Sequence, residues 1–333
     1  MKTLKNTALT LNISLHGAEL TSIRDSFGRE FLWQADPAFW KRHSPVLFPI
    51  VGSLWDKHFR VNGREYEMGQ HGFARDMDFS LVSEREDEMW FELTSSPETL
   101  AKYPYEFTLR IGYRLEANKI HVMWEVSGDD SQTMWFQIGA HPAFYLPRFV
   151  YGGGSCVSGT GSCASGLDSA IGPTSGSAVS IAVSDFDREC LGCFRLYGRG
   201  AGGVVPLESF RYIKVSEKQC TDISDVQELA TPGGVMPLDD HTFDIGAYII
   251  GDSQVCRVDL VSTTGLRCVS LEFDTPLVGL WAPSTEGAPF VCIEPWYGRC
   301  DRVGFTGEFS ERDCVNSLSP GQVFRAGYTI TVG

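Results

Sequence analysis

The chain has 333 residues, 43% of them hydrophobic and 12% aromatic, so it can bury a large core and is not disordered throughout. Its 42 acidic and 28 basic residues leave a net charge of −14, which excludes nucleic acid and membrane surfaces as expected partners. Ten cysteines are too few for a disulfide scaffold, and no apolar run reaches the ~20 residues that span a bilayer. We therefore expect a cytoplasmic protein with free thiols.

Two short stretches carry helix signals. Asp36-Pro37 predicts a short helix that runs through Trp40, and Ser96-Pro97 predicts another that ends before Pro104. Neither stretch is long. Helices therefore contribute little to the predicted fold.

Alternation of apolar and polar residues predicts most of the secondary structure. It is clearest in residues 107–115 and recurs in residues 120–126, 179–183 and 328–332. This period of two is typical of a strand with one buried and one exposed face. Because Gly and Pro punctuate these stretches, the sequence favours short antiparallel strands over βαβ units. We predict an all-β protein with two large packed antiparallel sheets in a single domain, residues 1–333.

Residues 151–178 differ in composition from the rest of the chain. They include 8 Gly and 7 Ser among 28 positions, and no Lys or Arg. Such a segment buries too little apolar surface to offset the entropy lost on ordering. We predict a flexible surface insertion; the alternative is a mobile lid, because the segment begins just after the cluster around His141.

Motifs for nucleotides and metals are weak. Gly159-Thr-Gly161 lacks the third glycine, the preceding strand and the following helix of a dinucleotide-binding loop. Cys190 and Cys193 form an isolated CxxC, and the 7 histidines never occur as HxH or HExxH. The sequence therefore predicts neither a metal nor a cofactor.

Three short polar clusters stand out in apolar surroundings. They are residues 70–76 (QHGFARD), 138–144 (IGAHPAF) and 290–298 (FVCIEPWYG). Taken singly, each has a structural explanation: a turn cap, a hydrogen-bonded buried histidine, or a glutamate paired with arginine.

Two details favour chemistry over structure. His141 and Glu294 each precede a proline, which holds the preceding residue extended and suits a strand end or edge that opens on a cleft. Each is followed by an aromatic residue, Phe144 or Trp296, whose flat ring suits the apolar face of a sugar. A fixed glutamate and a fixed histidine on separate strands make a general base and a general acid.

In this order, the three clusters resemble the aldose 1-epimerase (galactose mutarotase-like) family, and most closely the branch with HGFAR, GAHPAF and CIEPWxG. Similar stretches extend to residues 47–52, 103–107, 279–281 and 288–296. The resemblance implies a β-supersandwich that interconverts the α and β anomers of an aldohexose without metal or cofactor.

The resemblance also implies roles for individual residues. Glu294 takes the proton of the anomeric hydroxyl, His141 protonates the ring oxygen, and His71 and Arg75 contact the sugar. We expect Glu294 and His141 to converge from opposite edges of a groove with a hexose-sized gap between them. Burial must raise the pKa of Glu294, whereas an unperturbed histidine pKa of ~6.5 already suits the reaction.

Two positions depart from the family pattern. Ser53 stands where many members have arginine, which removes one contact to sugar or phosphate. Gly246 stands where some members have a substrate-orienting acid, and Asp244 and Asp274 are weak substitutes.

Two other functions stay open beside mutarotation of neutral aldoses. A hexose-6-phosphate epimerase needs a second cation besides Arg75, because phosphate carries nearly two charges. The candidates for this second cation are residues whose positions relative to the site the sequence does not determine: Arg24, Arg42, Lys57 and Arg60. A non-catalytic carbohydrate-binding or regulatory protein is the third possibility, although binding by itself needs no acid–base pair. The expected partner is a small sugar or sugar phosphate, bound by a monomer or homodimer.

Overall fold

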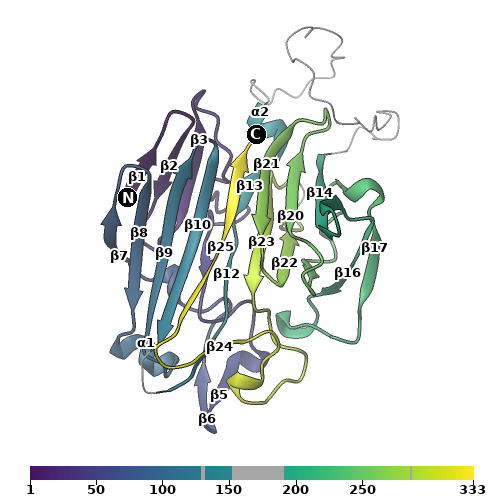
Figure 1. Cartoon of the computed structure of the whole chain (residues 1–333). Helices are drawn as coiled ribbons and strands as arrows, with labels where there is room; N and C mark the ends of the chain where they lie inside the picture. Colours follow the sequence, from purple (N-terminus) through teal and green to yellow (C-terminus); the bar gives the residue numbers. More distant parts are fainter. Residues whose placement is uncertain (129–131, 152–190, 286) are drawn as a thin grey trace.

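Figure 1 shows the computed structural model, which describes residues 1–128, 132–151, 191–285 and 287–333. Strands are its main regular structure and pair antiparallel, so the predicted all-β fold of large packed sheets is confirmed. Apart from Tyr151, the Gly/Ser-rich segment 151–178 lies outside the described residues, as do the strand predicted at 179–183 and Cys190. The single domain remains a prediction.

A ten-stranded sheet spans the molecule in the order β15-β14-β20-β21-β25-β10-β9-β8-β7, with β18 also paired to β14. Its strands are β7 (Ser80–Glu84), β8 (Glu88–Thr94), β9 (Phe107–Glu116), β10 (Lys119–Gly128), β14 (Gly192–Gly200), β15 (Gly203–Pro206), β18 (Val235–Leu238), β20 (Arg257–Val261), β21 (Arg267–Phe273) and β25 (Val323–Val332).

An eight-stranded sheet runs in the order β17-β16-β19-β22-β23-β12-β4, with β13 also paired to β23. Its strands are β4 (Val46–Leu47), β12 (Ile138–Ala140), β13 (Ala143–Tyr145), β16 (Ser209–Lys214), β17 (Gln227–Ala230), β19 (Tyr248–Ile250), β22 (Leu277–Trp281) and β23 (Phe290–Tyr297).

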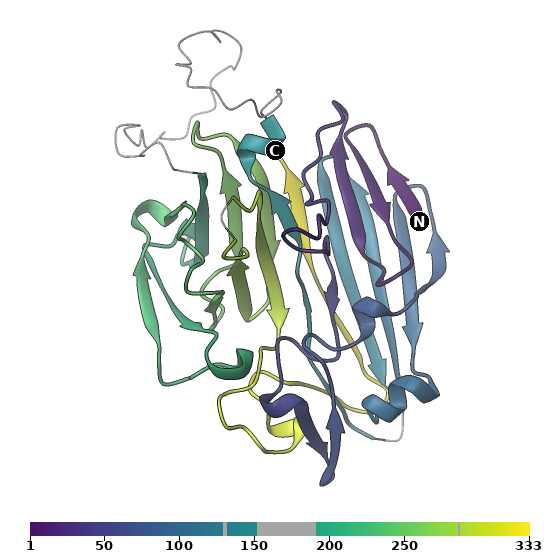
Figure 2. The ribbon, with the colours of Figure 1, turned by 180° about the vertical axis from the view of Figure 1, so that it is seen from behind.

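Smaller sheets complete the fold, and one of them lies in front of β8–β10 when the molecule is seen from behind (Figure 2). That sheet is formed by β1 (Lys2–Lys5), β2 (Leu9–Ile13) and β3 (Leu20–Asp25). The two-stranded sheets pair β5 (His58–Val61) with β6 (Arg64–Glu67), and β11 (Met134–Phe136) with β24 (Asn316–Leu318).

Three of the predicted strands appear as β9, β10 and β25, which are adjacent in the ten-stranded sheet. In β9 the odd-numbered residues from Phe107 to Leu115 are all buried, as the alternation predicts. The physical reason is simple: a strand's successive side chains point to opposite faces, so a period-two apolar pattern fills one face.

Helices are short, and within the described residues none is long and apolar enough to cross a membrane. The predicted helix after Ser96 is confirmed as α1 (Pro97–Lys102), where Ser96 and Thr99 cap each other. The helix predicted after Asp36 does not form, because Asp36 only closes a turn through Phe39 and Trp40. The remaining helices among residues 1–128, 132–151, 191–285 and 287–333 are α2 (Pro147–Tyr151), η1 (Trp55–Lys57), η2 (Ala74–Asp76), η4 (Glu217–Gln219), η5 (Pro232–Gly234) and η6 (Phe309–Glu311).

Strand β23 is buried on both of its faces. Val291 and Ile293 point into the main core between the sheets. The alternate residues point the other way, where Phe290 and Cys292 join one small apolar cluster and Trp296 joins another. Glu294 lies between these two clusters on the same face.

Candidate active site

Antiparallel pairing between β23 and the segment that contains β12 and β13 brings the predicted acid and base together. Ala143 pairs with Cys292, and the same register places His141 opposite Glu294. The imidazole Nε2 lies 3.2 Å from the carboxyl Oε2, and the two side chains are only 10% and 2% exposed. The prediction of a hexose-sized gap between Glu294 and His141 is therefore wrong, because the two residues are cross-strand neighbours.

The positions of the two residues differ from the expected strand ends. His141 lies in the interruption between β12 and β13, as expected for a residue before a proline. Glu294 instead lies inside β23, which is a central strand between β22 and β12. The carboxyl is thus held by the sheet itself, not by a loop.

Burial sets the protonation of this pair. It raises the pKa of Glu294 well above its ordinary value, and only the indole N–H of Trp296 opposes this rise. Burial also lowers the pKa of His141 to about 3, helped by the positive charge of Arg75. The prediction for Glu294 is confirmed, whereas His141 does not keep an unperturbed pKa. Burial thus favours the uncharged forms of both groups in the sugar-free protein.

Hydrogen bonding within the pair is incomplete. Three buried atoms make no hydrogen bond of normal geometry within the described part of the chain: Glu294 Oε2, His141 Nδ1 and Trp296 Nε1. Such orphaned atoms are uncommon in a folded core, because each costs about 1–3 kcal/mol. They are the donors and acceptors that a polar ligand would satisfy.

A tight loop aims His71 at the pair. His71 and Gly72 both have left-handed backbone angles, and a Cβ at residue 72 would lie 2.2 Å from the carbonyl oxygen of Phe48, so only glycine fits there. The N–H of Gly52 donates to His71 Nδ1 at 3.0 Å, which leaves the ring proton on Nε2. Burial, followed by the charges of the neighbouring His141 and Arg75, lowers the pKa of His71. The ring lies 5.7 Å from that of His141, so His71 offers a neutral N–H donor close to the pair.

Arg75 has a second arginine beside it. Its Nη2 donates to the carbonyl of Gln70 at 2.7 Å, and its Nε lies 3.7 Å from the carboxylate of Asp76. Asp76 also accepts from Arg42 at 2.9 Å. Burial and the charge of Arg42 lower the pKa of Arg75 to about 10, so it remains charged at neutral pH. Two arginines share one carboxylate, and their positive charge lowers the pKa of both nearby histidines, His71 and His141.

The structure brings Trp296, but not Phe144, to the acid–base pair. Phe144 is fully buried in the main core, because it points to the face of β13 opposite to that of Ala143. Trp296 lies on the face of Glu294, but it is 95% buried and packs with Leu47 and its neighbours, so only its indole N–H is directed at the carboxyl.

The aromatic residue that covers the pair was missed by the sequence reasoning. The ring of Trp40 stacks on His141 at 4.7 Å and 26°, and Trp281 approaches the same imidazole edge-on at 5.5 Å. Trp40 is only half-buried. The only signal in the sequence was a pair of adjacent aromatic residues, Phe39 and Trp40, in an otherwise polar stretch.

The positions that depart from the family pattern lie apart from the pair. Ser53 bonds to Gln219 at 3.2 Å and lines a cavity of about 730 Å³ next to Gln70. Asp244 and Asp274 make exposed ion pairs, with His241 and Arg199 respectively. Neither carboxylate is brought to His141 or Glu294.

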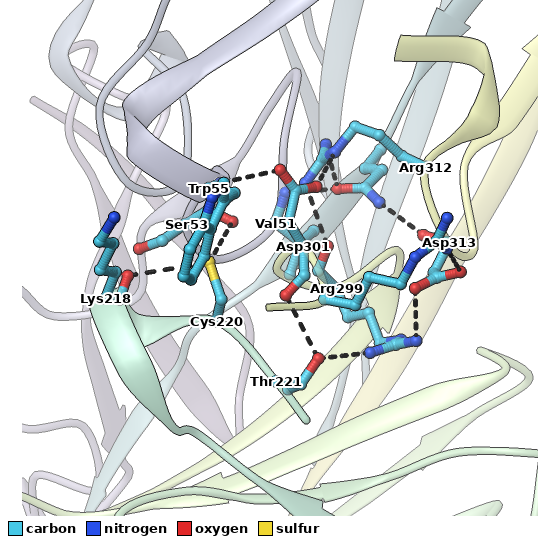
Figure 3. Close-up of polar contacts among 12 residues, drawn as sticks. Val51, Ser53, Trp55, Lys218, Cys220, Thr221, Arg299, Asp301, Arg312 and Asp313 are labelled. Atoms are coloured by element: carbon cyan, nitrogen blue, oxygen red, sulfur yellow. Dashed lines mark hydrogen bonds and ion pairs between the residues drawn. The ribbon is translucent and has the colours of Figure 1, made fainter. Parts of the chain in front are cut away.

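A buried polar network supports the loop that positions His71 (Figure 3). Asp301 accepts from Arg312 Nε at 2.6 Å and from the backbone N–H of Trp55 at 2.9 Å. Arg312 also donates to Gln137, which in turn accepts from the N–H of Val51. These bonds anchor residues 51–55, which include Gly52, the partner of His71.

Three comparisons relate the chain to known proteins. The sequence model of the family described as Aldose 1-epimerase matches residues 1–154. Protein LacX (chromosomal) of Lactococcus lactis subsp. lactis is 28% identical over 99% of this chain and 98% of its own length.

Two solved structures share the fold over the full chain. A galactose mutarotase related enzyme from Lactobacillus acidophilus has a TM-score of 0.79 at 28% identity, covering 100% of this chain and 97% of that one. A galactose mutarotase-like protein from Lactobacillus casei has a TM-score of 0.79 at 26% identity, covering 100% of both chains. Residues 1–154 thus match the aldose 1-epimerase family model, and the full chain has the fold of galactose mutarotase-like proteins.

Proposed function

We propose that this protein interconverts the α and β anomers of an aldohexose, with His141 and Glu294 as the acid–base pair. The observation that carries the proposal is the buried contact of 3.2 Å between these two side chains, whose uncharged forms are favoured by burial. A carboxyl and an imidazole that are buried and in contact with each other are suited to exchanging protons with one substrate.

Ring opening explains why the two groups are adjacent. The reaction removes a proton from the anomeric hydroxyl and delivers a proton to the ring oxygen, and both oxygens are bonded to the same carbon. An acid and a base that serve them together must therefore be neighbours. As the resemblance implies, Glu294 is the base and His141 the acid, once the proton of the carboxyl has passed to the imidazole.

The proton balance closes over one cycle. Glu294 gains the proton that the sugar loses, and His141 supplies the proton that the ring oxygen gains. The open aldehyde rotates about its C1–C2 bond and recloses on the other face with the roles reversed. Because the pair ends with the proton count it had at the start, no cofactor is required by the chemistry.

The surrounding residues support the charge that develops. His71 Nε2–H and the Arg75 guanidinium are donors beside the pair, and donors of this kind stabilise a developing oxyanion. Trp40 offers an aromatic face over His141 for the apolar side of a pyranose.

A second candidate is a hexose-6-phosphate epimerase, and the pairing of Arg42 with Arg75 through Asp76 favours it. A phosphate would find two guanidinium groups there, opposed by one exposed carboxylate. The neighbouring cavity of about 730 Å³ is less suited to a phosphate, because the positive charges of Lys57 and Lys218 are balanced there by Asp56 and Glu67.

The test is anomer exchange on freshly dissolved α-glucose, α-galactose and α-glucose 6-phosphate, followed by polarimetry and exchange NMR. We expect acceleration of at least one sugar. Arg42→Met should weaken the reaction of the phosphorylated sugar at least tenfold if that sugar is the substrate, and should leave a neutral sugar within about threefold. Spontaneous rates for all three sugars would contradict the proposal, and binding without acceleration would favour a carbohydrate-binding protein.

A further inference from the structure

A thiol that the proposed reaction does not use lies beside the acid–base pair. Cys292 precedes Glu294 by two residues in β23, so both side chains point to the same face, and Cys292 is fully buried. One ligand atom from each of His141, Cys292 and Glu294 lies within 4.8 Å of the other two.

These three atoms match the ligand preferences of one metal ion. Zn²⁺ takes imidazole nitrogen, thiolate sulfur and carboxylate oxygen at about 2.0–2.3 Å in tetrahedral geometry, which places its ligands about 3–4 Å apart. The nitrogen and oxygen of His141 and Glu294 already lie 3.2 Å apart. The thiol sulfur lies within 4.8 Å of both atoms, so a small shift of the side chains would complete three corners of the tetrahedron.

A second observation points to a ligand at this place. Glu294 is 99% buried, yet its Oε2 has no hydrogen-bond partner among the residues that the structure describes, and it faces the imidazole of His141. Burial of an oxygen without a hydrogen bond costs free energy, and coordination of that oxygen to a metal ion would offset the cost. Two of the three donors, Cys292 and Glu294, would come from strand β23, and His141 would come from the interruption between β12 and β13. A fourth ligand would complete the tetrahedron.

We propose that Zn²⁺ binds to His141, Cys292 and Glu294 and inhibits the enzyme by occupying its acid–base pair. A metal ion binds the deprotonated forms of its ligands, so the proton of the Cys292 thiol and any proton on the Glu294 carboxyl pass to solvent on binding. Affinity therefore rises with pH. The metal is an inhibitor because the bound imidazole and carboxylate can no longer exchange protons with a sugar.

The inhibition rests on the proposed function, but the binding does not, and the experiment separates them. Metal-free protein is titrated with Co²⁺, whose bond to a thiolate produces a charge-transfer absorption band, and Zn²⁺ is then added to displace it. Anomer exchange is measured in parallel against Zn²⁺ concentration, with each rate normalised to that variant's own metal-free rate.

The variants are Cys292→Ser and, as a matched control, Cys256→Ser, which changes a buried thiol just before β20 in the other large sheet. We expect the cobalt–thiolate band and reversible Zn²⁺ inhibition in the wild type and in C256S. In C292S the band should disappear and the half-inhibiting Zn²⁺ concentration should rise at least tenfold.

A wild-type protein without the band, or a C292S variant that binds Co²⁺ and Zn²⁺ as the wild type does, would overturn the metal site. A band that C292S abolishes, in a protein without epimerase activity, would support the metal site and contradict the proposed function instead.

Discussion

Two buried acid–base pairs in this protein have opposite designs. Asp301 and Arg312 are 1% and 0% exposed, and both carboxylate oxygens and the donors of the guanidinium have partners. Glu294 and His141 are almost as buried, yet each retains an atom that makes no hydrogen bond to any residue placed in the structure. Burial is therefore common to both pairs, and hydrogen bonding is what distinguishes them.

This difference in hydrogen bonding suits the two pairs to different roles, one structural and one in binding a ligand. A fully bonded charge pair is held in one arrangement and stabilises the loops that it joins. An incompletely bonded pair loses its charge, since burial raises the pKa of Glu294 and lowers the pKa of His141. Its hydrogen-bond donors and acceptors remain available to a ligand. The four predictions below test this contrast, from the largest effect to the smallest.

Glu294→Gln should abolish most of the epimerase activity and little of the stability. The rate should fall by about 10²–10⁴-fold, the range of a lost general acid–base group. The free energy of unfolding should change by no more than about 1 kcal/mol, because the amide has nearly the size of the carboxyl and burial favours the neutral form of that carboxyl. Exchange NMR and urea unfolding measure the two effects. A variant that keeps more than a tenth of the rate would remove Glu294 from the mechanism.

Asp301→Asn should mainly lower the stability, whereas Glu294→Gln should mainly lower the rate. It leaves the buried charge of Arg312 unpaired, so the free energy of unfolding should fall by about 3–5 kcal/mol in urea titrations. The double variant Asp301→Leu with Arg312→Met removes both charges and should recover a substantial part of the loss. If the single variant is as stable as the wild type, the network does not support the loop at Gly52.

Acid should destabilise the protein through its buried histidines. Folding depresses the pKa of His141 to about 3 and that of His71 well below 6.5, so their contribution to stability is complete above pH 6.5. It is lost as the pH falls toward 3, because the unfolded chain takes up protons that the folded chain does not. Thermal unfolding between pH 7 and pH 4 should therefore show a shallower decline in His141→Asn than in the wild type.

His241→Asn serves as the control for that experiment, because exposed Asp244 raises the pKa of His241 instead of lowering it. This variant should keep the acid-dependent decline of the wild type. If His141→Asn declines as steeply as the wild type, the histidine is not held neutral in the fold.

Asp274→Asn should have the smallest effect. Its ion pair with Arg199 is exposed, and such pairs contribute about 0–1 kcal/mol. Both the free energy of unfolding and the epimerase rate should stay near wild type. A rate loss of tenfold or more would instead identify Asp274 as the substrate-orienting acid that the sequence could not locate.

Local sequence patterns predicted the elements that depend on near neighbours. The alternation of residues 107–115 predicted β9, and Ser96-Pro97 predicted α1, because strand faces and helix caps are decided within a few residues. The same local reasoning failed at Asp36, where a good cap is followed by a turn that carries Trp40 onto His141. There, packing against a distant ring overrides the local preference.

The sequence by itself determined the all-β class and the identities of Glu294, His141, His71 and Arg75 as candidate site residues, because residue types and their short spacings are visible in one dimension. Only the tertiary structure decided that the acid and base are cross-strand neighbours, that Arg42 joins Arg75, and that Phe144 points away. The physical reason is that strand register, burial and the resulting pKa shifts depend on segments more than a hundred residues apart, and no local pattern encodes their distances.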